Sequence, residues 1–355
     1  MRLAVALSGG SDSLLSLGLL RAAGHDLLGL HAHFLPPGEK ARALAAAIDA
    51  QCRVLGVPFA AVDLSREFRA QVIDPFIHAY AAGLTPNPCA SCNRTMKFGL
   101  LLDAARENGA THIATGHYAR IEATPTGAAL WRGADASRDQ SYFLSLVPGK
   151  ALGQAVFPLA RRRKTDNPAA LAALGLAPPL PAESREVCFV PGDDYRAFLT
   201  ASGAPLSGPG PIVLADGVRL GTHNGLWQHT IGQRRGLGIP YSEPLYVLAK
   251  DARSNTLIVG IKAELSATAC RTGPANILTP PAEWPDEVLA QTCYRMPPRP
   301  ATARLDAAGG LAIVFAEPVA RPTPGQVAAL YDAAGRVLAG GEIQDSGLVF
   351  PGKLG

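Results

Sequence analysis

The chain has 355 residues, of which 48% are hydrophobic and 17% are charged, and its formal net charge is +4. This length allows two or three domains that each bury a core of their own. No stretch approaches the ~18–20 uncharged apolar residues of a membrane span, so a membrane protein is not expected. One arginine precedes the first apolar run, without the pattern of a signal or transit peptide, and we therefore expect a cytoplasmic protein.

A glycine-rich segment follows the first predicted strand almost at once. Residues 3–7 are typical of a buried strand and residues 14–20 of a helix. Such a loop binds phosphate, because backbone N–H groups and the positive end of the helix dipole face the anion. The loop lacks the terminal lysine of the usual P-loop, and an ordinary Ser/Gly/Asp turn is the competing interpretation. The candidate residues are Ala6, Leu7, Ser8, Gly9, Gly10, Ser11, Asp12 and Ser13.

The next hundred residues alternate strand-like and helix-like runs, the βαβ pattern of a parallel sheet. The sequence predicts strands over residues 27–33, 58–62 and 111–115, and helices over residues 41–55, 66–81 and 95–108. Gly116 and His117 follow the last of these strands. Ligands of open α/β sheets gather at the carboxyl ends of the strands, so we expect both residues to share a site with the glycine loop.

Three cysteines stand out in the first two hundred residues. Cys89 and Cys92 form a C-x-x-C pair in a proline-rich segment, residues 85–94, that we expect to be a rigid loop. Such a pair could be a redox pair or half of a zinc site, but a four-thiolate zinc site needs a second pair that the sequence lacks. Cys188 has no cysteine near it in the sequence, and a buried cysteine of the core is the competing interpretation for it. Six cysteines in a cytoplasmic chain indicate thiol or metal chemistry rather than a disulfide framework.

The second half of the chain is organised differently. Residues 161–180 are basic and predicted to be helical, and the clusters at 161–164 and 233–235 could each hold phosphates or form a solvated face. After residue 198, short strands and glycine turns predict a small β-rich module. Strands at 311–315 and 327–331 then fit a small barrel or sandwich. The expected domains are residues 1–199, 200–264 and 265–355.

Seven segments resemble the MnmA family of bacterial tRNA-specific 2-thiouridylases, which belongs to the PP-loop ATP pyrophosphatase superfamily. They occur in the family's order and span most of the chain, with the fewest matches in the C-terminal domain. The segments are SGGSDS (8–13), TPNPCASCNRTMKFG (85–99), ATGHYAR (114–120), RDQSYFL (138–144), EVCFV (186–190), HTIGQRRGLGI (229–239) and TPGQ (323–326). The resemblance implies an α/β fold: a PP-loop parallel-sheet domain, a small β-rich central domain and a C-terminal β-barrel.

The resemblance also implies a reaction. ATP bound on the glycine loop would adenylate the C2 oxygen of the wobble uridine in tRNA, and sulfur would then replace that oxygen to give 2-thiouridine. Asp12 would help to hold Mg²⁺ or the phosphates, and Gly116 would pack against the nucleotide. Ala32 occupies the position of a methionine that contacts the adenine in the family, so a backbone contact can carry over where a side-chain contact cannot.

Two routes for the sulfur stay open. In the first, Cys188 carries a persulfide from a cysteine desulfurase or sulfur-relay protein, and Cys92 is the nucleophile that releases the sulfur by forming a transient Cys92–Cys188 disulfide. In the second, Cys89, which replaces an aspartate common in the family, joins the other two in holding a [4Fe–4S] cluster with one open iron. The thiolate is the reactive form, and basic neighbours would favour it. The candidates by sequence proximity are Arg94, Lys97 and Arg185.

The remaining matches imply contacts with the anticodon loop of tRNA, which is the expected partner. We expect the enzyme itself to be a monomer. Asn87, Pro88 and Cys89 match the segment around the target base, which must be extruded for chemistry at C2. Other tRNA-facing positions are His117, Arg138, Asp139, Gln140, Cys293, Tyr294 and Gln326. Arg138 stands where lysine is common and Cys293 where arginine is usual.

Two alternative functions remain open at this point. A PP-loop synthetase that amidates another acceptor would need ammonia rather than clustered thiols. A non-catalytic module that binds RNA or carries a cluster would not need an intact glycine loop. Cys52 and Cys270 are expected to be structural.

Overall fold

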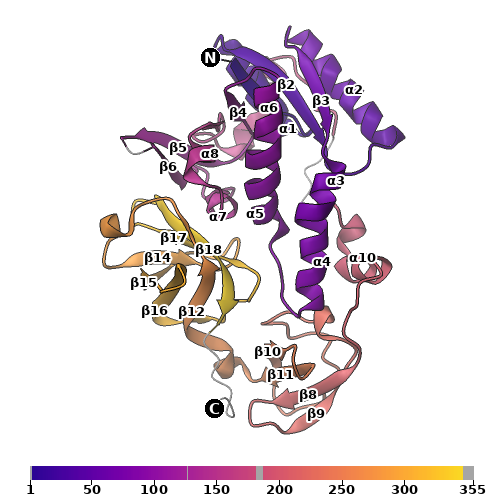
Figure 1. Cartoon of the computed structure of the whole chain (residues 1–355), viewed down its shortest axis with the longest axis vertical. Helices are drawn as coiled ribbons and strands as arrows, with labels where there is room; N and C mark the ends of the chain where they lie inside the picture. The colour runs from indigo at the N-terminus through magenta and orange to yellow at the C-terminus, as the bar shows by residue number, and fades with distance from the viewer. Residues whose placement is uncertain (1, 126, 181–186, 347–355) are drawn as a thin grey trace.

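The computed structural model describes residues 2–125, 127–180 and 187–346. Figure 1 shows a parallel-sheet domain at the top, a small β domain at the bottom and a β-barrel at the left. The longest helix of these ranges, α2 (Glu39–Val54), has 16 residues, and none of the described helices combines the length and apolar character that a membrane span requires.

Five parallel strands form the first sheet, in the order β3-β2-β1-β4-β7. Their bounds are β1 Arg2–Ala6, β2 Asp26–His33, β3 Phe59–Asp63, β4 His112–Ala114 and β7 Ala155–Val156. The first four confirm the predicted strands with small shifts at their ends. The strand order reverses between β1 and β4, and the carboxyl ends of strands at such a switch point are where ligands of open sheets bind. The glycine loop follows β1, and Gly116 and His117 follow β4.

Helices cover both faces of this sheet. Leu3 and Val5 of β1 pack with α1 (Ser11–Ala22) and α2 in one core, whereas Ala4 between them belongs to the core on the side of α6 (Leu101–Glu107). Successive side chains of a strand point to opposite faces, so a strand buried on both faces is apolar throughout. This explains why β1 reads as an unbroken apolar run.

Two long helical segments differ from the prediction. The first runs through α3 Ser65–Phe68, η1 Arg69–Ile73 and α4 Asp74–Ala81; the second runs through α5 Pro88–Cys92, η2 Asn93–Leu100 and α6. η1 and η2 are π-helical, a form that often marks functional sites. The expectation of a loop was wrong for residues 88–92. Asn87 Oδ1 accepts a hydrogen bond from Ala90 N (3.2 Å) as an N-cap, and Pro88 suits the first turn of a helix.

Further short elements complete the first domain. The helix predicted over residues 161–180 was too long, because only η3 Lys164–Asp166 and α9 Asn167–Ala173 form within this range. An antiparallel pair, β5 and β6, was not predicted. The remaining bounds are β5 Ala119–Thr124, β6 Gly127–Arg132, α7 Ser141–Leu144, α8 Gly149–Leu152, η4 Pro191–Asp193 and α10 Tyr195–Ala201.

The other two units are built from strands. The central sheet has the order β10-β11-β8-β9, with β8 Gly210–Leu214, β9 Arg219–His223, β10 Tyr246–Asp251 and β11 Thr256–Gly260. The C-terminal strands are β12 Ser266–Pro274, β13 Asn276–Ile277, β14 Val288–Gln291, β15 Arg299–Leu305, β16 Gly310–Ala320, β17 Val327–Tyr331 and β18 Val337–Asp345. Pairing of β12 with both β16 and β18 closes six of them into a barrel. Three short turns of 3₁₀ helix accompany these sheets: η5 Leu226–Gln228, η6 Lys262–Leu265 and η7 Pro281–Glu283.

The barrel shares a hydrophobic core with the first domain. Tyr142 and Leu144 of α7 are buried in the same cluster as Val327 and Tyr331 of β17, and Tyr142 OH donates a hydrogen bond to Val327 O (3.0 Å). This docking holds the barrel loop at residues 323–326 against the start of α5. The predicted fold class, an α/β domain followed by a β-rich central domain and a β-barrel, is confirmed.

Candidate active site

The glycine loop has the backbone geometry of an anion site. Gly9 has φ +85°, a conformation that favours glycine, and a Cβ there would have to displace the end of the Leu44 side chain, 2.7 Å away. Ser8 N donates to Ser13 Oγ (3.2 Å), and Ser13 Oγ donates to Gly10 O (2.9 Å), which folds the loop over the start of α1. Among the residues that the structure describes, no side chain caps this helix end. Its N–H groups are therefore available to an anion.

Asp12 lies in the first turn of α1 and is the centre of a polar network. Its Oδ1 accepts hydrogen bonds from Tyr118 OH (3.0 Å), Lys164 Nζ (2.7 Å) and Asn167 Nδ2 (2.8 Å). None of these three partners was predicted to be at the site. The basic run at 161–164 was a signal for Lys164, and the matched segment at 114–120 contained Tyr118, but nothing in the sequence indicated Asn167.

Gly116 brings the end of β4 directly against this network. A Cβ at Gly116 would lie 2.9 Å from both C and Cβ of Asp12, a contact closer than real Cβ atoms make. Ala6 and Ala32 are half-buried at the ends of β1 and β2. The Nδ1–H of His31 donates to Leu7 O (2.7 Å), and burial lowers the pKa of His31, so this imidazole is neutral at pH 7 and ties β2 to the entry of the loop.

The cysteines of the predicted sulfur site approach one another from two segments. Cys89 and Cys92 lie on α5, and Cys188 follows the second gap in the described chain. Cys92 and Val187 pack against the same aromatic cluster, in which Phe189 is buried against Phe68. Cys188 is therefore held between two residues that are anchored beside Cys92. All three cysteines are free thiols.

The three thiols and Lys97 lie close enough to affect one another's pKa values. Burial raises the pKa of Cys92 to about 12; the charge of Lys97 opposes this rise, and Cys188 and Cys89 add to it. Burial of the thiol groups also raises the pKa of Cys89 and of Cys188, although each residue as a whole is exposed. The charge of Lys97 again lowers the pKa of both. Such effects fall off over about 10 Å. Lys97 is thus a cation of this cluster.

Arg94 and Arg185 are the other two predicted basic neighbours of the thiols, and neither is placed beside them by the described structure. The charge of Arg94 acts on Glu342 of β18, where it opposes a rise in pKa that burial causes. Arg185 lies outside the described residues, as does Glu186, the first residue of the matched segment at 186–190. Lys97 is therefore the predicted basic neighbour that the structure brings to the thiols.

His117 lies between the thiols and the glycine-loop side of the candidate site. It is buried, its Nδ1 lies 2.7 Å from Thr115 Oγ1, and its ring is 5.7 Å from that of Phe98. Burial lowers the pKa of His117 well below its ordinary value, and the charge of Lys97 lowers it further. A continuous path of neighbours thus runs from Asp12 through Gly116 and His117 to Lys97 and the cysteines.

Among the described residues, no three or more His, Cys, Asp or Glu side chains are arranged to hold a metal ion. Cys89, Cys92 and Cys188 are thus not arranged around a single metal ion in this conformation. A magnesium site of the kind found with nucleotides is a different case, because it uses one or two carboxylates and the phosphates themselves. Asp12 fits that pattern, since all the bonds it accepts from described side chains end on Oδ1.

The segment predicted to surround the target base contacts the barrel. Gln326 Nε2 donates to Thr85 O (2.8 Å) and to Pro86 O (3.2 Å). Asn87 and Pro88 line a cavity of about 70 Å³, together with residues of α4 and with Glu342 of β18. Residues from two segments far apart in the sequence, 86–91 and 325–342, therefore line one small cavity beside α5.

The other residues predicted to face tRNA lie in varied surroundings. Asp139 is buried and accepts hydrogen bonds from Arg132 Nε, Gly133 N, and the backbone N and Oγ of Ser141. Gln140 exchanges hydrogen bonds with the backbone of Tyr118. The remaining residues are half-buried Arg138, exposed Cys293, and Tyr294, whose ring lies 4.4 Å from that of Phe143.

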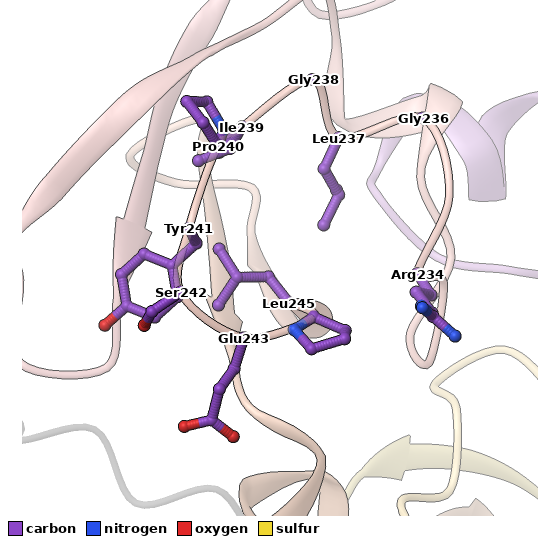
Figure 2. Close-up of a pocket in the computed structure, with 11 residues that line it drawn as sticks. Arg234, Gly236, Leu237, Gly238, Ile239, Pro240, Tyr241, Ser242, Glu243 and Leu245 are labelled. Atoms are coloured by element: carbon purple, nitrogen blue, oxygen red, sulfur yellow. The ribbon is translucent and has the colours of Figure 1, made fainter.

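A larger hollow lies in the central domain. The segment at residues 234–245 encloses about 580 Å³, and Figure 2 shows Arg234 on one side of it with Tyr241 and Glu243 on the other. Arg234 belongs to the second basic cluster, residues 233–235, for which the sequence left open a phosphate contact or a solvated face. The glycine loop and the three cysteines do not line this hollow.

Three family models match successive parts of the chain. They are described as a tRNA methyl transferase HUP domain (residues 1–192), a tRNA methyl transferase PRC-barrel domain (196–261) and an aminomethyltransferase beta-barrel domain (268–343). The first alone covers more than half of the 355 residues.

Similar proteins match over nearly their whole length. A tRNA-specific 2-thiouridylase MnmA of Oleidesulfovibrio alaskensis is 54% identical over 352 residues, which covers 97% of this chain and 99% of the relative. One from Nitratidesulfovibrio vulgaris strain Miyazaki F is 55% identical with the same coverage, and one from Magnetococcus marinus is 41% identical, covering 96% and 98%. Together with the HUP-domain match, these identities show that the chain belongs to the MnmA family of tRNA-specific 2-thiouridylases.

Proposed function

We propose that this protein is an ATP-dependent tRNA sulfurtransferase, which adenylates C2 of the wobble uridine and then replaces the C2 oxygen with sulfur. The observation that carries the proposal is the path from the glycine loop to the thiols. Gly116 contacts Asp12, His117 follows Gly116, and Lys97 acts electrostatically on both His117 and Cys92. An activated oxygen and a reactive sulfur can therefore meet at one base.

ATP fits the carboxyl edge of the first sheet. The uncapped start of α1 and the turn at Gly9 would receive its phosphates, with Asp12 on Mg²⁺, Gly116 against the nucleotide and Ala32 near the adenine. Magnesium would offset the charge of the phosphates during transfer. Bond formation between the uridine C2 oxygen and the α-phosphorus, with departure of pyrophosphate, would turn that oxygen into a good leaving group.

For the sulfur we propose the persulfide route. The terminal sulfur of a Cys188 persulfide, supplied by a desulfurase or relay protein, attacks C2, and AMP departs with the electron pair. The Cys92 thiolate then attacks Cys188 Sγ, which breaks the bond to the transferred sulfur and leaves 2-thiouridine and a Cys92–Cys188 disulfide. A dithiol reductant supplies two electrons to restore both thiols. Lys97 would favour the thiolate form needed for the second attack.

The iron–sulfur route is the alternative, and one substitution separates the two. Cys89→Asp removes one of three possible cluster ligands and restores the residue common in the family. We expect the purified variant to thiolate tRNA at about the wild-type rate when a persulfide donor is supplied. Loss of activity, together with iron and a visible absorption band in anaerobically purified wild-type protein that the variant lacks, would establish the cluster instead.

The proposed partner is the anticodon loop of tRNA, with Asn87, Pro88 and Cys89 around the extruded base. The residues of the barrel and of the 138–140 segment would contact the neighbouring nucleotides, and Arg234 in the central-domain hollow could contact phosphates. Cytoplasmic location and a monomeric state remain part of this proposal. Two of the three matching family models carry tRNA methyl transferase descriptions; the glycine loop and three neighbouring thiols favour activation and sulfur transfer over methyl transfer.

The test is a single assay with two products. Purified protein, unmodified tRNA, Mg²⁺–ATP, a persulfide donor and a reductant are expected to yield AMP and 2-thiouridine in equal amounts. Omission of tRNA should stop AMP formation. Thiolation without AMP formation, or AMP formation without thiolation of tRNA, would contradict the proposal.

A further inference from the structure

The glycine loop contains no basic residue of its own, yet a lysine from far along the chain reaches it. Lys164 Nζ lies 2.7 Å from Asp12 Oδ1 and 3.3 Å from Ser11 Oγ, at the first turn of α1. The Lys164 side chain is 17% exposed and that of Asp12 is 24% exposed. The ammonium group therefore sits, largely buried, at the helix end where an anion is expected.

The position of Lys164 is fixed from the backbone. Its N–H donates to Asp135 Oδ2 (2.9 Å), and this bond lowers the pKa of Asp135. Asp135 thus holds the start of η3 in place, and the four methylene groups of Lys164 span from there to the loop. A lysine is a flexible point charge, so its head group can change partners while its backbone stays fixed.

The Asp12 network is incomplete as it stands. Asn167 is 1% exposed, and its Nδ2 donates to Asp12 Oδ1 and to Tyr118 OH (2.7 Å). Its Oδ1 is buried without a hydrogen-bond partner among the described residues. Buried polar atoms are normally satisfied, so an unpaired acceptor beside Asp12 and Lys164 points to a ligand with a donor, such as a water on a bound metal ion.

We propose that Lys164 is the phosphate-binding lysine of this site, which pairs with Asp12 when no nucleotide is bound and moves to the β- and γ-phosphates when Mg²⁺–ATP occupies the loop. With Mg²⁺ held by Asp12, the Lys164 ammonium would lose this partner and could pair with the incoming phosphates. As the bond between the α-phosphorus and the bridging oxygen breaks, pyrophosphate takes the electron pair. Lys164 stabilises that charge and needs to exchange no proton.

This role rests on the proposed function and makes it more specific. The sequence places the lysine about 150 residues after the loop instead of at its end, which is why the loop does not match the usual P-loop pattern. The cation is supplied by tertiary structure. It also explains why one lysine in an otherwise arginine-rich run, 161–164, turns toward the site.

The test measures ligand binding without tRNA, by titration calorimetry, in wild type and in Lys164→Met. We expect the variant to bind Mg²⁺–ATP and pyrophosphate about 10–100-fold more weakly, the usual effect of losing one charge-assisted hydrogen bond. AMP affinity should change less than about threefold, because AMP lacks the β- and γ-phosphates. The affinity for tRNA should also stay unchanged, which separates nucleotide phosphates from those of the RNA backbone.

Two further variants keep the inference falsifiable. Lys150→Met removes the same charge from the exposed last turn of α8 and should bind all ligands as wild type does. Lys164→Arg keeps the charge and should recover most of the ATP affinity. Equal loss of ATP and AMP binding in Lys164→Met, or unchanged ATP binding, would overturn the role of Lys164. Failure of the wild-type protein to bind ATP would instead overturn the proposed function.

Discussion

The glycine loop and the thiol site differ in how far apart along the chain their residues lie. The loop is a continuous run, residues 6–13, whose conformation follows from one glycine and two serines. The thiol site joins α5 to Cys188, almost a hundred residues later, and depends on a shared aromatic cluster to bring them together. Continuous sites can be recognised from local chemistry, whereas assembled sites depend on the packing of the elements that carry them.

The largest effect should come from the assembled site. Cys92→Ser and Cys188→Ser are each expected to reduce thiolation at least about a thousandfold, because a hydroxyl neither carries sulfur nor forms the disulfide. The affinity for tRNA and for ATP should stay within about threefold of wild type. Mass spectrometry of digested tRNA measures the first, and filter binding and calorimetry measure the others.

A buried cysteine outside the site provides the control. Cys270→Ala in β12 should thiolate normally, since Cys270 belongs to the barrel core. Normal 2-thiouridine formation by either Cys92→Ser or Cys188→Ser would contradict the thiol mechanism. The thiol site would then not be a catalytic site to compare with the glycine loop.

The junction between the two sites should give the next largest effect. Gly116→Ala places a Cβ 2.9 Å from the backbone of Asp12, which cannot move without shifting the start of α1. We expect ATP affinity to fall about 10–100-fold and unfolding free energy to fall by about 1–3 kcal/mol, the usual cost of overpacking. Calorimetry and urea unfolding measure these two quantities.

A matched glycine shows whether the effect is local. Gly149→Ala in α8 would place its Cβ 3.9 Å from the nearest atom, an ordinary contact, and should change neither quantity. If Gly116→Ala also binds ATP normally, the end of β4 is not part of the nucleotide site.

The smallest effect should come from the charge that connects the two sites. Lys97 lowers the pKa of Cys92 against a larger effect of burial, which raises it to about 12. The Cys92 thiolate fraction, and so its alkylation rate, should rise about tenfold per pH unit from pH 7 to 10. Lys97→Met raises the pKa further, and at pH 8 alkylation should be about three- to tenfold slower.

The conservative variant distinguishes charge from packing. Lys97→Arg keeps the positive charge and should alkylate at a rate close to that of wild type. Faster alkylation in Lys97→Met would mean that loosening of the site outweighs the lost charge, because the electrostatic effect has the opposite sign. Iodoacetamide labelling followed by peptide mass spectrometry resolves Cys92 from its neighbours.

Much of the first domain could be predicted because its signals are local. The strands β1 to β4 are short apolar runs bounded by turns, and their alternation with helices indicates a parallel sheet. The sequence wrongly predicts a loop over residues 88–92, because Pro86 and Pro88 are also typical of turns. Asn87 and Pro88 instead start a helix, and a cap and a turn share the same residue types.

The sequence by itself determined the order of the elements, the glycine loop and the positions of the three cysteines along the chain, since each depends on neighbouring residues. Only the tertiary structure decided that Lys164 and Asn167 complete the Asp12 network, that Lys97 rather than Arg94 acts on the thiols, and that Gln326 holds the 85–88 segment. These contacts join residues that are 5 to more than 200 positions apart. Their geometry follows from how sheets, helices and barrel pack, and no local pattern encodes that packing.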